Sequence, residues 1–143
     1  MIERATVDDI AIVAEMAAQV WETDAAPLVE EFKDFLADEE SAVFLCREGG
    51  EAVGFAQCQL RHDYVEGTET SPVGYLEGIF VKADHRQKSY GKQLLSACES
   101  WAKEQGCTEF ASDCELENTT SFLFHMAAGF QEANRIICFK KAL

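Results

Sequence analysis

A cluster of positively charged side chains stands immediately before a helical sequence pattern. Four of the 12 lysines and arginines fall between Lys82 and Lys92. The apolar run 75–81 precedes this window and an amphipathic pattern follows it, which predicts the order strand, polar loop, helix. The first turn of a helix offers unpaired N–H groups and the positive end of the helix dipole, both of which suit a phosphate. The window therefore indicates an anion site, although a solvated basic loop would have the same composition.

The overall charge argues against a polyanionic partner. The chain carries 12 basic and 26 acidic residues, a net charge of −14. Residues 1–81 hold 4 basic and 18 acidic side chains, whereas residues 82–143 hold 8 of each. Such an acidic protein repels nucleic acid and anionic lipid at long range. We therefore expect no nucleic-acid and no membrane partner, and a small phosphate-containing ligand at the basic window.

Length and cysteine usage define the class of protein. The 143 residues predict a single domain, residues 1–143, that can bury a sizeable core. No apolar run approaches the ~18 residues of a membrane span, and residues 1–5 begin no signal peptide, so we expect a cytoplasmic protein. The cysteines show no metal-ligand spacing, which predicts no metal site and mostly reduced, half-buried thiols. A catalytic thiolate remains an alternative for one of Cys46, Cys58, Cys98, Cys107, Cys114 and Cys138.

Hydrophobic periodicity predicts the element order β-α-α-β-β-β-α-β-α-β. Antiparallel hairpins come first and strand–helix–strand units follow, so we expect an α/β fold with a mixed sheet and helices on both faces. Predicted strands cover 2–5, 42–46, 52–60, 73–82, 108–113 and 130–141; predicted helices cover 6–20, a segment beginning near Pro27, 89–105 and 118–128.

Two motifs resemble those of the GNAT (GCN5-related) N-acetyltransferases. The cofactor loop of that family reads Arg/Gln-x-x-Gly-x-Gly/Ala, and residues 86–91 read Arg-Gln-Lys-Ser-Tyr-Gly. Its later signature is an asparagine, a tyrosine seven residues on, and then Gly-Phe; Asn118, His125 and the pair Gly129-Phe130 stand at these positions. The resemblance covers nearly the whole chain. It implies a single-domain GNAT-like fold, with a mostly antiparallel sheet splayed between the fourth and fifth strands.

The resemblance implies that acetyl-CoA is the cosubstrate. Its diphosphate would lie on the main-chain N–H groups of residues 87–91. The family has glycine where this chain has Ser89; a left-handed serine would cost about 1 kcal/mol, so we expect somewhat weaker binding. Asn118 would contact the pantetheine arm, or would only cap its helix. The implied cofactor contacts are Ile79, Phe80, Val81, Arg86, Gln87, Lys88, Ser89, Tyr90, Gly91, Lys92 and Asn118.

Three side chains are candidates for proton transfer. A primary ammonium must lose a proton before it attacks a thioester, and Glu77 and Asp113 are carboxylates near the centre of the predicted sheet. Glu77 is the preferred base, Asp113 is the alternative, and either could be a salt-bridged strand residue instead. His125 replaces the family's tyrosine and could protonate the leaving thiolate, or could simply pack against the sheet.

Within the family, the segments 75–81, 111–113 and 117–118, and Trp21 before an acidic segment, resemble the aminoglycoside 6′-N-acetyltransferases. The implied acceptor is an aminoglycoside or another cationic amine, and dimers are common among similar proteins, so we expect a homodimer. A polyamine, peptide or lysine acetyltransferase and an acetyl-CoA-binding sensor without turnover remain alternatives. An acidic surface could also serve solubility alone. The expected substrate contacts are Trp21, Glu22, Asp24, Tyr64, Glu77, Asp113 and Glu115.

Overall fold

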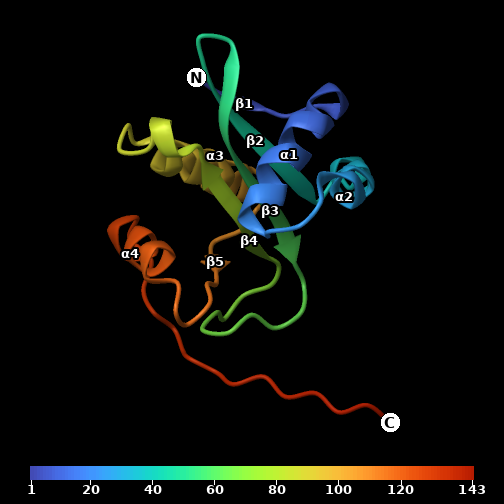
Figure 1. The fold of residues 1–143 in the computed structure, drawn as a ribbon. Coiled ribbons are helices and arrows are strands. Elements are labelled where there is room, and N and C mark those ends of the chain that lie inside the picture. The colour runs from blue at the N-terminus through green and yellow to red at the C-terminus, as the bar shows by residue number, and fades with distance from the viewer.

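A five-stranded sheet with the order β1-β2-β3-β4-β5 forms the centre of the structure, a computed structural model that describes residues 1–143 (Figure 1). The first four strands pair antiparallel and β5 pairs parallel with β4, which confirms the predicted mixed, mostly antiparallel sheet. The strands are β1 (Ile2–Arg4), β2 (Ser41–Glu48), β3 (Glu51–Arg61), β4 (Val73–Val81) and β5 (Phe110–Ser112).

Helices cover both faces of this sheet. Helices α1 (Ile10–Val20) and α2 (Ala25–Ala37) pack on one face, and α3 (Tyr90–Glu104) packs on the other. Helix α4 (Thr119–Ala127) lies on the α3 side, where Phe124 and Ala128 contact the core beneath α3. Short 3-10 turns, Val7–Asp9 and Ala83–His85, precede α1 and α3. None of these helices combines the length and apolar character that a bilayer crossing requires.

The apolar spacing of each helix explains which face it covers. In α1 the buried residues Ile10, Val13, Ala14 and Ala17 recur at helical spacing and contact buried β2 and β3 side chains. In α3 the residues Leu94, Leu95, Cys98, Trp101 and Ala102 form the corresponding stripe. Because each strand sends alternate side chains to the two faces, one sheet supports both cores. Four of the six free cysteines are fully buried, more than the half-burial predicted, and pack as small core residues.

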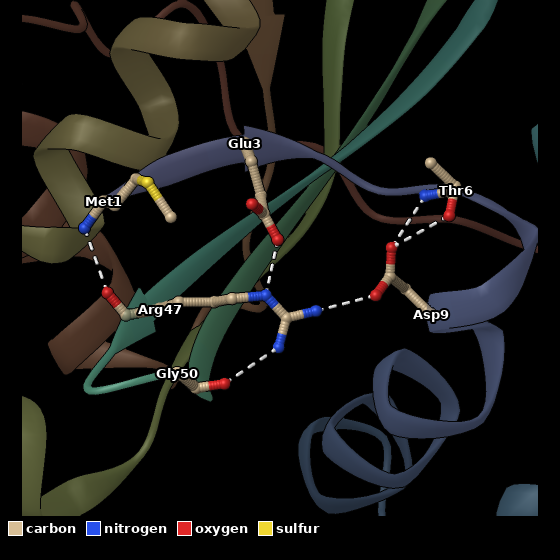
Figure 2. A network of polar contacts seen from close by, with 6 residues as sticks. All are labelled: Met1, Glu3, Thr6, Asp9, Arg47 and Gly50. Atoms are coloured by element: carbon tan, nitrogen blue, oxygen red, sulfur yellow. Dashed lines mark hydrogen bonds and ion pairs between the residues drawn. The ribbon is translucent and has the colours of Figure 1, made fainter.

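Arg47 fastens the N-terminal strand to the rest of the sheet (Figure 2). Its guanidinium contacts the Glu3 carboxylate, donates to Asp9 Oδ1 at 2.7 Å and donates to the Gly50 carbonyl oxygen at 3.3 Å. Asp9 in turn accepts from the main-chain N–H of Thr6 at 2.9 Å, which is the reciprocal half of a capping box. One side chain of β2 thus holds β1, the start of α1 and the β2–β3 turn together.

Two predicted boundaries move for physical reasons. Helix α2 begins at Ala25, so Pro27 lies inside its first turn, where its missing N–H costs no intrahelical bond. Strand β5 is shorter than predicted and pairs only Phe110 to Ser112 with β4. Beyond Ser112 the two strands separate, as the resemblance implied.

The predicted last strand, 130–141, is wrong for the single chain. Residues 130–143 form no helix or strand. Phe130 still packs against Phe110 and His125, and Asn134 donates to Glu66 of the β3–β4 loop, but the rest of the segment leads away to the C-terminus in Figure 1. Ile136, Ile137 and Phe139 are 68%, 80% and 91% exposed. A strand satisfies its main-chain N–H and C=O groups through a neighbouring strand, and this segment has none beside it.

Candidate active site

The turn before α3 presents a row of unused hydrogen-bond donors. No main-chain N–H from Gln87 to Lys92 donates to a protein acceptor, whereas the Arg86 N–H donates to the Ala83 carbonyl oxygen at 3.3 Å and the Gln93 N–H to that of Ser89 at 3.1 Å. These donors lie at the N-terminus of a 15-residue helix, where the dipole adds positive potential. The turn therefore fits a doubly charged phosphate group.

The backbone of this turn is left-handed at two residues. Ser89 has φ 64° and ψ 16°, so it adopts the left-handed conformation that was considered for this position in the sequence. Gln87 also has φ 64°. Left-handed residues between ordinary ones turn neighbouring N–H groups toward one side and create a concavity for anions. The strain at each non-glycine residue costs about 1 kcal/mol.

The second glycine of the loop motif permits a close contact between helices. A Cβ atom at Gly91 would lie 3.0 Å from Cε1 of Phe124 in α4. Any larger residue at this position would push α4 away from the N-terminus of α3. The glycine thus serves helix packing beside the row of free amides.

Glu48 engages part of the predicted basic cluster. Its carboxylate accepts from Tyr90 Oη at 2.5 Å and from Lys88 Nζ at 3.0 Å. The bond from Tyr90, and then that from Lys88, lowers the pKa of Glu48 to about 2. The same bond to the carboxylate raises the pKa of Tyr90 to about 12. Arg86 Nε donates to the Val81 carbonyl oxygen at 2.9 Å, and Lys92 forms no ion pair. Neither of these two cations has a carboxylate partner, whereas Lys88 is paired with Glu48.

A β-bulge places Glu77 at the point where the sheet splays. In the β3–β4 register Gln57 lies opposite Gly78 and Cys58 opposite Leu76, so Glu77 is the extra residue of β4. On the other side of β4, pairing with β5 ends at Leu76 opposite Ser112. Residues 77–81 therefore have an open strand edge toward β5. The edge fits an extended ligand arm that bonds main-chain groups there.

The Glu77 carboxylate accepts from three donors. Arg61 binds it in a bidentate manner, with Nη2 2.7 Å from Oε1 and Nε 3.0 Å from Oε2. The side-chain amide of Gln59 also donates to Oε2. The Glu77 side chain is 17% exposed, so the paired charge is largely shielded from solvent. Both carboxylate oxygens of Glu77 are therefore occupied by protein donors.

Asp113 has one protein partner. The Tyr75 hydroxyl donates to Asp113 Oδ2, and the Arg61 guanidinium stacks over the Tyr75 ring, 3.5 Å from the ring centroid. Burial, and then the bond to Asp113, raises the pKa of Tyr75 well above its usual range, so the phenol keeps its proton. Arg61 thereby links the two carboxylates that the sequence had nominated separately.

His125 lies on the opposite face of the sheet. Its Nε2 is 2.8 Å from Ser112 Oγ, and its Nδ1 is 2.7 Å from the main-chain carbonyl oxygen of Ser121. The rings of Phe124 and Phe130 lie 5.8 Å and 5.1 Å from the imidazole, centroid to centroid. Asn118 caps the helix that carries His125, since its Oδ1 accepts from the Ser121 N–H at 3.1 Å.

Comparison with known proteins identifies the family of this chain. Residues 10–130 match the acetyltransferase (GNAT) family model. This protein belongs to the GNAT acetyltransferase family. The predicted family, enzyme class and fold are confirmed by this match and by the structures that follow.

Several relatives of this GNAT acetyltransferase carry one name. An aminoglycoside N(6′)-acetyltransferase type 1 of Stenotrophomonas maltophilia is 44% identical over 143 residues, which cover 99% of this chain and 93% of that protein. An enzyme of the same name from Acinetobacter haemolyticus is 37% identical over 129 residues, covering 90% and 89%.

Solved structures show the same fold. The crystal structure of the apo aminoglycoside antibiotic 6′-N-acetyltransferase AAC(6′)-IG of Acinetobacter haemolyticus superposes with a TM-score of 0.95 at 35% identity, covering 100% of this chain and 99% of that one. The aminoglycoside acetyltransferase AAC(6′)-Iy, in complex with the bisubstrate analogue CoA-S-monomethyl-acetylneamine, also gives 0.95 at 35% identity, covering 100% and 98%.

The remaining predicted substrate residues surround the splay unevenly. Trp21 ends α1 and lies over β4, where a Cβ atom at Gly78 would come within 3.0 Å of its Cζ2. Glu22 and Asp24 follow it in the α1–α2 connection, and both are exposed. Tyr64 lies in the β3–β4 loop and is 76% exposed, and Glu115 lies after β5, also exposed. Neither Tyr64 nor Glu115 forms a polar side-chain contact that ties it to the carboxylate pair.

Sequence reasoning missed the side chains that organise this GNAT site. Gln59 and Arg61 are two residues apart on β3 and so share a face, and Tyr75 and Glu77 do the same on β4. Strand alternation alone places each of these two pairs on one face of its strand. It does not specify the pairing register that brings the two strands together. Ser112, which contacts His125, lies within the segment 111–113, and no local feature of the sequence marks it as a site residue.

Proposed function

We propose that this protein transfers the acetyl group of acetyl-CoA to the 6′-amine of aminoglycoside antibiotics. The observation that carries the proposal is the pair of carboxylates, Glu77 and Asp113, at the point where β4 and β5 separate. A cationic amine that enters there would lie beside the open edge of β4. The substrate class follows from the relatives' names, and resistance to the drug is the expected consequence.

Acetyl-CoA would be held by the two features that lack internal partners. The free amides of residues 87–92 fit the diphosphate, and the open edge at 77–81 fits the pantetheine arm. The Lys82 N–H donates to the Val53 carbonyl oxygen, so the alternation of an antiparallel ladder turns the main chain of Phe80 toward β3 and that of Ile79 and Val81 toward the open edge. The Val81 carbonyl already accepts from Arg86, so Ile79 is the better candidate for a main-chain bond to the thioester. An N–H there would stabilise the developing oxyanion.

We infer different roles for the two carboxylates. Arg61 and Gln59 occupy both carboxylate oxygens of Glu77, so Glu77 would anchor the ammonium through its charge rather than take its proton. Asp113 bonds only Tyr75 and is exposed, so it retains acceptor capacity. We therefore propose Asp113 as the base, and this ranking reverses the preference drawn from the sequence.

A polycationic sugar would meet further acidic and aromatic groups around this pair. Trp21 lies against β4 and could stack on a sugar ring, and Glu22, Asp24 and Glu115 add negative potential near the splay. Tyr64 would reach the substrate only through its loop. The chain's −14 net charge would speed the encounter with a cationic drug and oppose nucleic-acid binding.

An amine panel with acetyl-CoA and a thiol-release readout tests the proposal. Release with kanamycin or tobramycin, and none with spermidine or an N-terminal peptide, is expected. Release with spermidine or peptide alone would support the alternative acetyltransferase. Acetyl-CoA binding without release for any amine would support the sensor alternative and overturn the proposal.

We further propose that the protein acts as a homodimer through its C-terminal segment. The segment 131–143 exposes Ile136, Ile137 and Phe139, while β5 is an edge strand with no partner on its outer side. A groove between the end of α3 and the start of β5 is lined by Ala102, Cys107 and Phe110 together with polar residues. A second copy's segment could add a strand there, and twofold symmetry would repeat the exchange.

Light scattering of the full chain and of residues 1–131 tests this dimer. The full chain should have twice the chain mass and the truncated form the single mass. Phe139→Asp should also weaken association, whereas Lys141→Ala, which keeps the apolar side chains, should not. A monomeric full chain would contradict the dimer and leave the catalytic proposal untouched.

We place the protein in the cytoplasm, where its six free thiols would stay reduced.

A further inference from the structure

Two consecutive residues at the end of β5 send their side chains to opposite faces of the sheet. Ser112 contacts His125 of α4, on the α3 side, whereas Asp113 contacts Tyr75 of β4, on the side of Arg61 and Glu77. This alternation is the ordinary property of a strand. It occurs here at the last paired residue before β4 and β5 part. A thioester between the parted strands would therefore have one proton-handling group on each side.

The contacts of His125 determine which nitrogen carries hydrogen. The Ser121 main-chain carbonyl, 2.7 Å from Nδ1, can only accept, so Nδ1 is the donor in that bond. Nε2 faces the Ser112 hydroxyl at 2.8 Å, and a hydroxyl can either donate or accept. The imidazole is thus provided with suitable partners in both its neutral and its protonated forms.

The direction of the Ser112 hydroxyl depends on that protonation. When the imidazole is neutral, Nε2 has a lone pair and the hydroxyl donates to it. When the imidazole is protonated, Nε2–H donates to Oγ, and the hydroxyl hydrogen is free to turn toward the gap between β4 and β5. Every polar contact of the ring is with Ser112 or Ser121.

We propose that Ser112 delivers the proton to the departing thiolate of CoA and that His125 positions and recharges it. This inference rests on the proposed acetyl transfer at this site. The amine nitrogen bonds to the acetyl carbon, the C–S bond breaks, and its electron pair goes to sulfur. Sulfur takes the Ser112 hydroxyl proton, and Oγ takes the Nε2 proton of His125. The ammonium loses two protons through Asp113 and water, so one proton is released to solvent overall.

No charged side chain contacts the imidazole. The elements packed against it contribute Ser112 from β5, Ser121 and Phe124 from α4, and Phe130 from the C-terminal segment. Asp113 is bonded to Tyr75, and Glu115 and Glu117 are exposed beyond β5. A pH response of the rate that depends on Ser112 would therefore report the imidazole.

Kinetics of the Ser112→Ala variant test the relay. Since the relay requires a protonated imidazole, wild-type kcat should fall on the alkaline side of its pH profile. Ser112→Ala should lower kcat about tenfold at the optimum, less than a usual general acid because a thiolate departs without full protonation. It should also abolish the alkaline fall and leave KM for acetyl-CoA unchanged. Ser112→Thr, which keeps a hydroxyl, should restore both, and Ser96→Ala on the exposed side of α3 serves as the matched control.

Two outcomes would overturn the relay. One is a Ser112→Ala variant with wild-type kcat and an intact alkaline fall. The other is ¹⁵N NMR of the full chain at high pH that shows neutral His125 with its hydrogen on Nε2, which needs no turnover. If the wild-type protein itself releases no CoA with any aminoglycoside, the proposed function fails, and the NMR arm still decides the relay geometry.

Discussion

The turn before α3 and the carboxylate pair at the sheet splay are both charged, but they differ in how their polar groups are satisfied. The N–H groups of residues 87–92 have no protein acceptor. Glu77 and Asp113 are bonded to Arg61, Gln59 and Tyr75 within the chain. The free N–H groups can bind a ligand without losing a protein partner, whereas at the carboxylate pair the oxygens of Glu77 are occupied and only Asp113 keeps acceptor capacity. We expect affinity to be determined mainly at the first region, and selectivity and rate at the second.

The difference is sharpest at the two carboxylates, where the largest effect is expected. Asp113→Asn should lower kcat by roughly 10²-fold, in the range for a lost general base, with little change in KM for acetyl-CoA. Glu77→Gln should mainly raise KM for the aminoglycoside, because it removes an anchor. Steady-state kinetics of both variants test this. A larger kcat loss for Glu77→Gln than for Asp113→Asn would reverse the assignment.

Removing the internal cation should disturb the satisfied region alone. Arg61→Met leaves the mostly buried Glu77 carboxylate with Gln59 as its only partner, which should lower the free energy of unfolding by about 1–3 kcal/mol. Denaturant unfolding measures this loss. Arg61→Lys should recover only part of it, since lysine cannot make the bidentate bond. Acetyl-CoA affinity should stay unchanged in both variants; a parallel loss would show that the two regions are coupled.

Relieving backbone strain should affect the unsatisfied region alone. Ser89 has a left-handed conformation, which glycine adopts without the strain that a Cβ atom causes. Ser89→Gly should raise the free energy of unfolding by up to about 1 kcal/mol and leave acetyl-CoA affinity at least as high. Calorimetric titration and thermal melting measure the two effects. Weaker cofactor binding would mean that the serine hydroxyl contacts the phosphate.

The smallest effect concerns the one carboxylate that intrudes on the basic turn. Glu48→Gln frees Lys88 and Tyr90, and should tighten acetyl-CoA binding by about two- to threefold at low salt, a modest gain because the groups are exposed. The pKa of Glu48 is lowered to about 2, so its bonds are intact at neutral pH and are lost only as the pH falls toward that value. Because His85 Nδ1 also lies 2.8 Å from the Glu48 carboxylate, the difference between variant and wild type should be constant only while the charge of His85 does not change. A gain that varies while that charge is fixed would identify another titrating group.

Much of the fold could be predicted because its signals are local. Alternation predicted β2, β3 and β4, helical spacing predicted α1, α3 and α4, and the basic turn was located by its charge and its place before a helix. The last strand failed because residues 130–141 have strand-forming character but no neighbour in the single chain. Strand formation depends on a partner, and no sequence window contains that partner.

The sequence by itself located the turn before α3 that we propose binds the diphosphate, since it consists of consecutive residues whose amides become free as soon as α3 forms. It also determined the family, through motifs that are contiguous in the chain. Only the tertiary structure decided what the carboxylates do. The side chains involved come from β3 (Arg61), from β4 (Tyr75 and Glu77) and from the end of β5 (Asp113). The β3–β4 register with its bulge decides which of them meet. Charge balance at the reaction centre is a property of that register, because electrostatic pairing depends on distance in space and not along the chain.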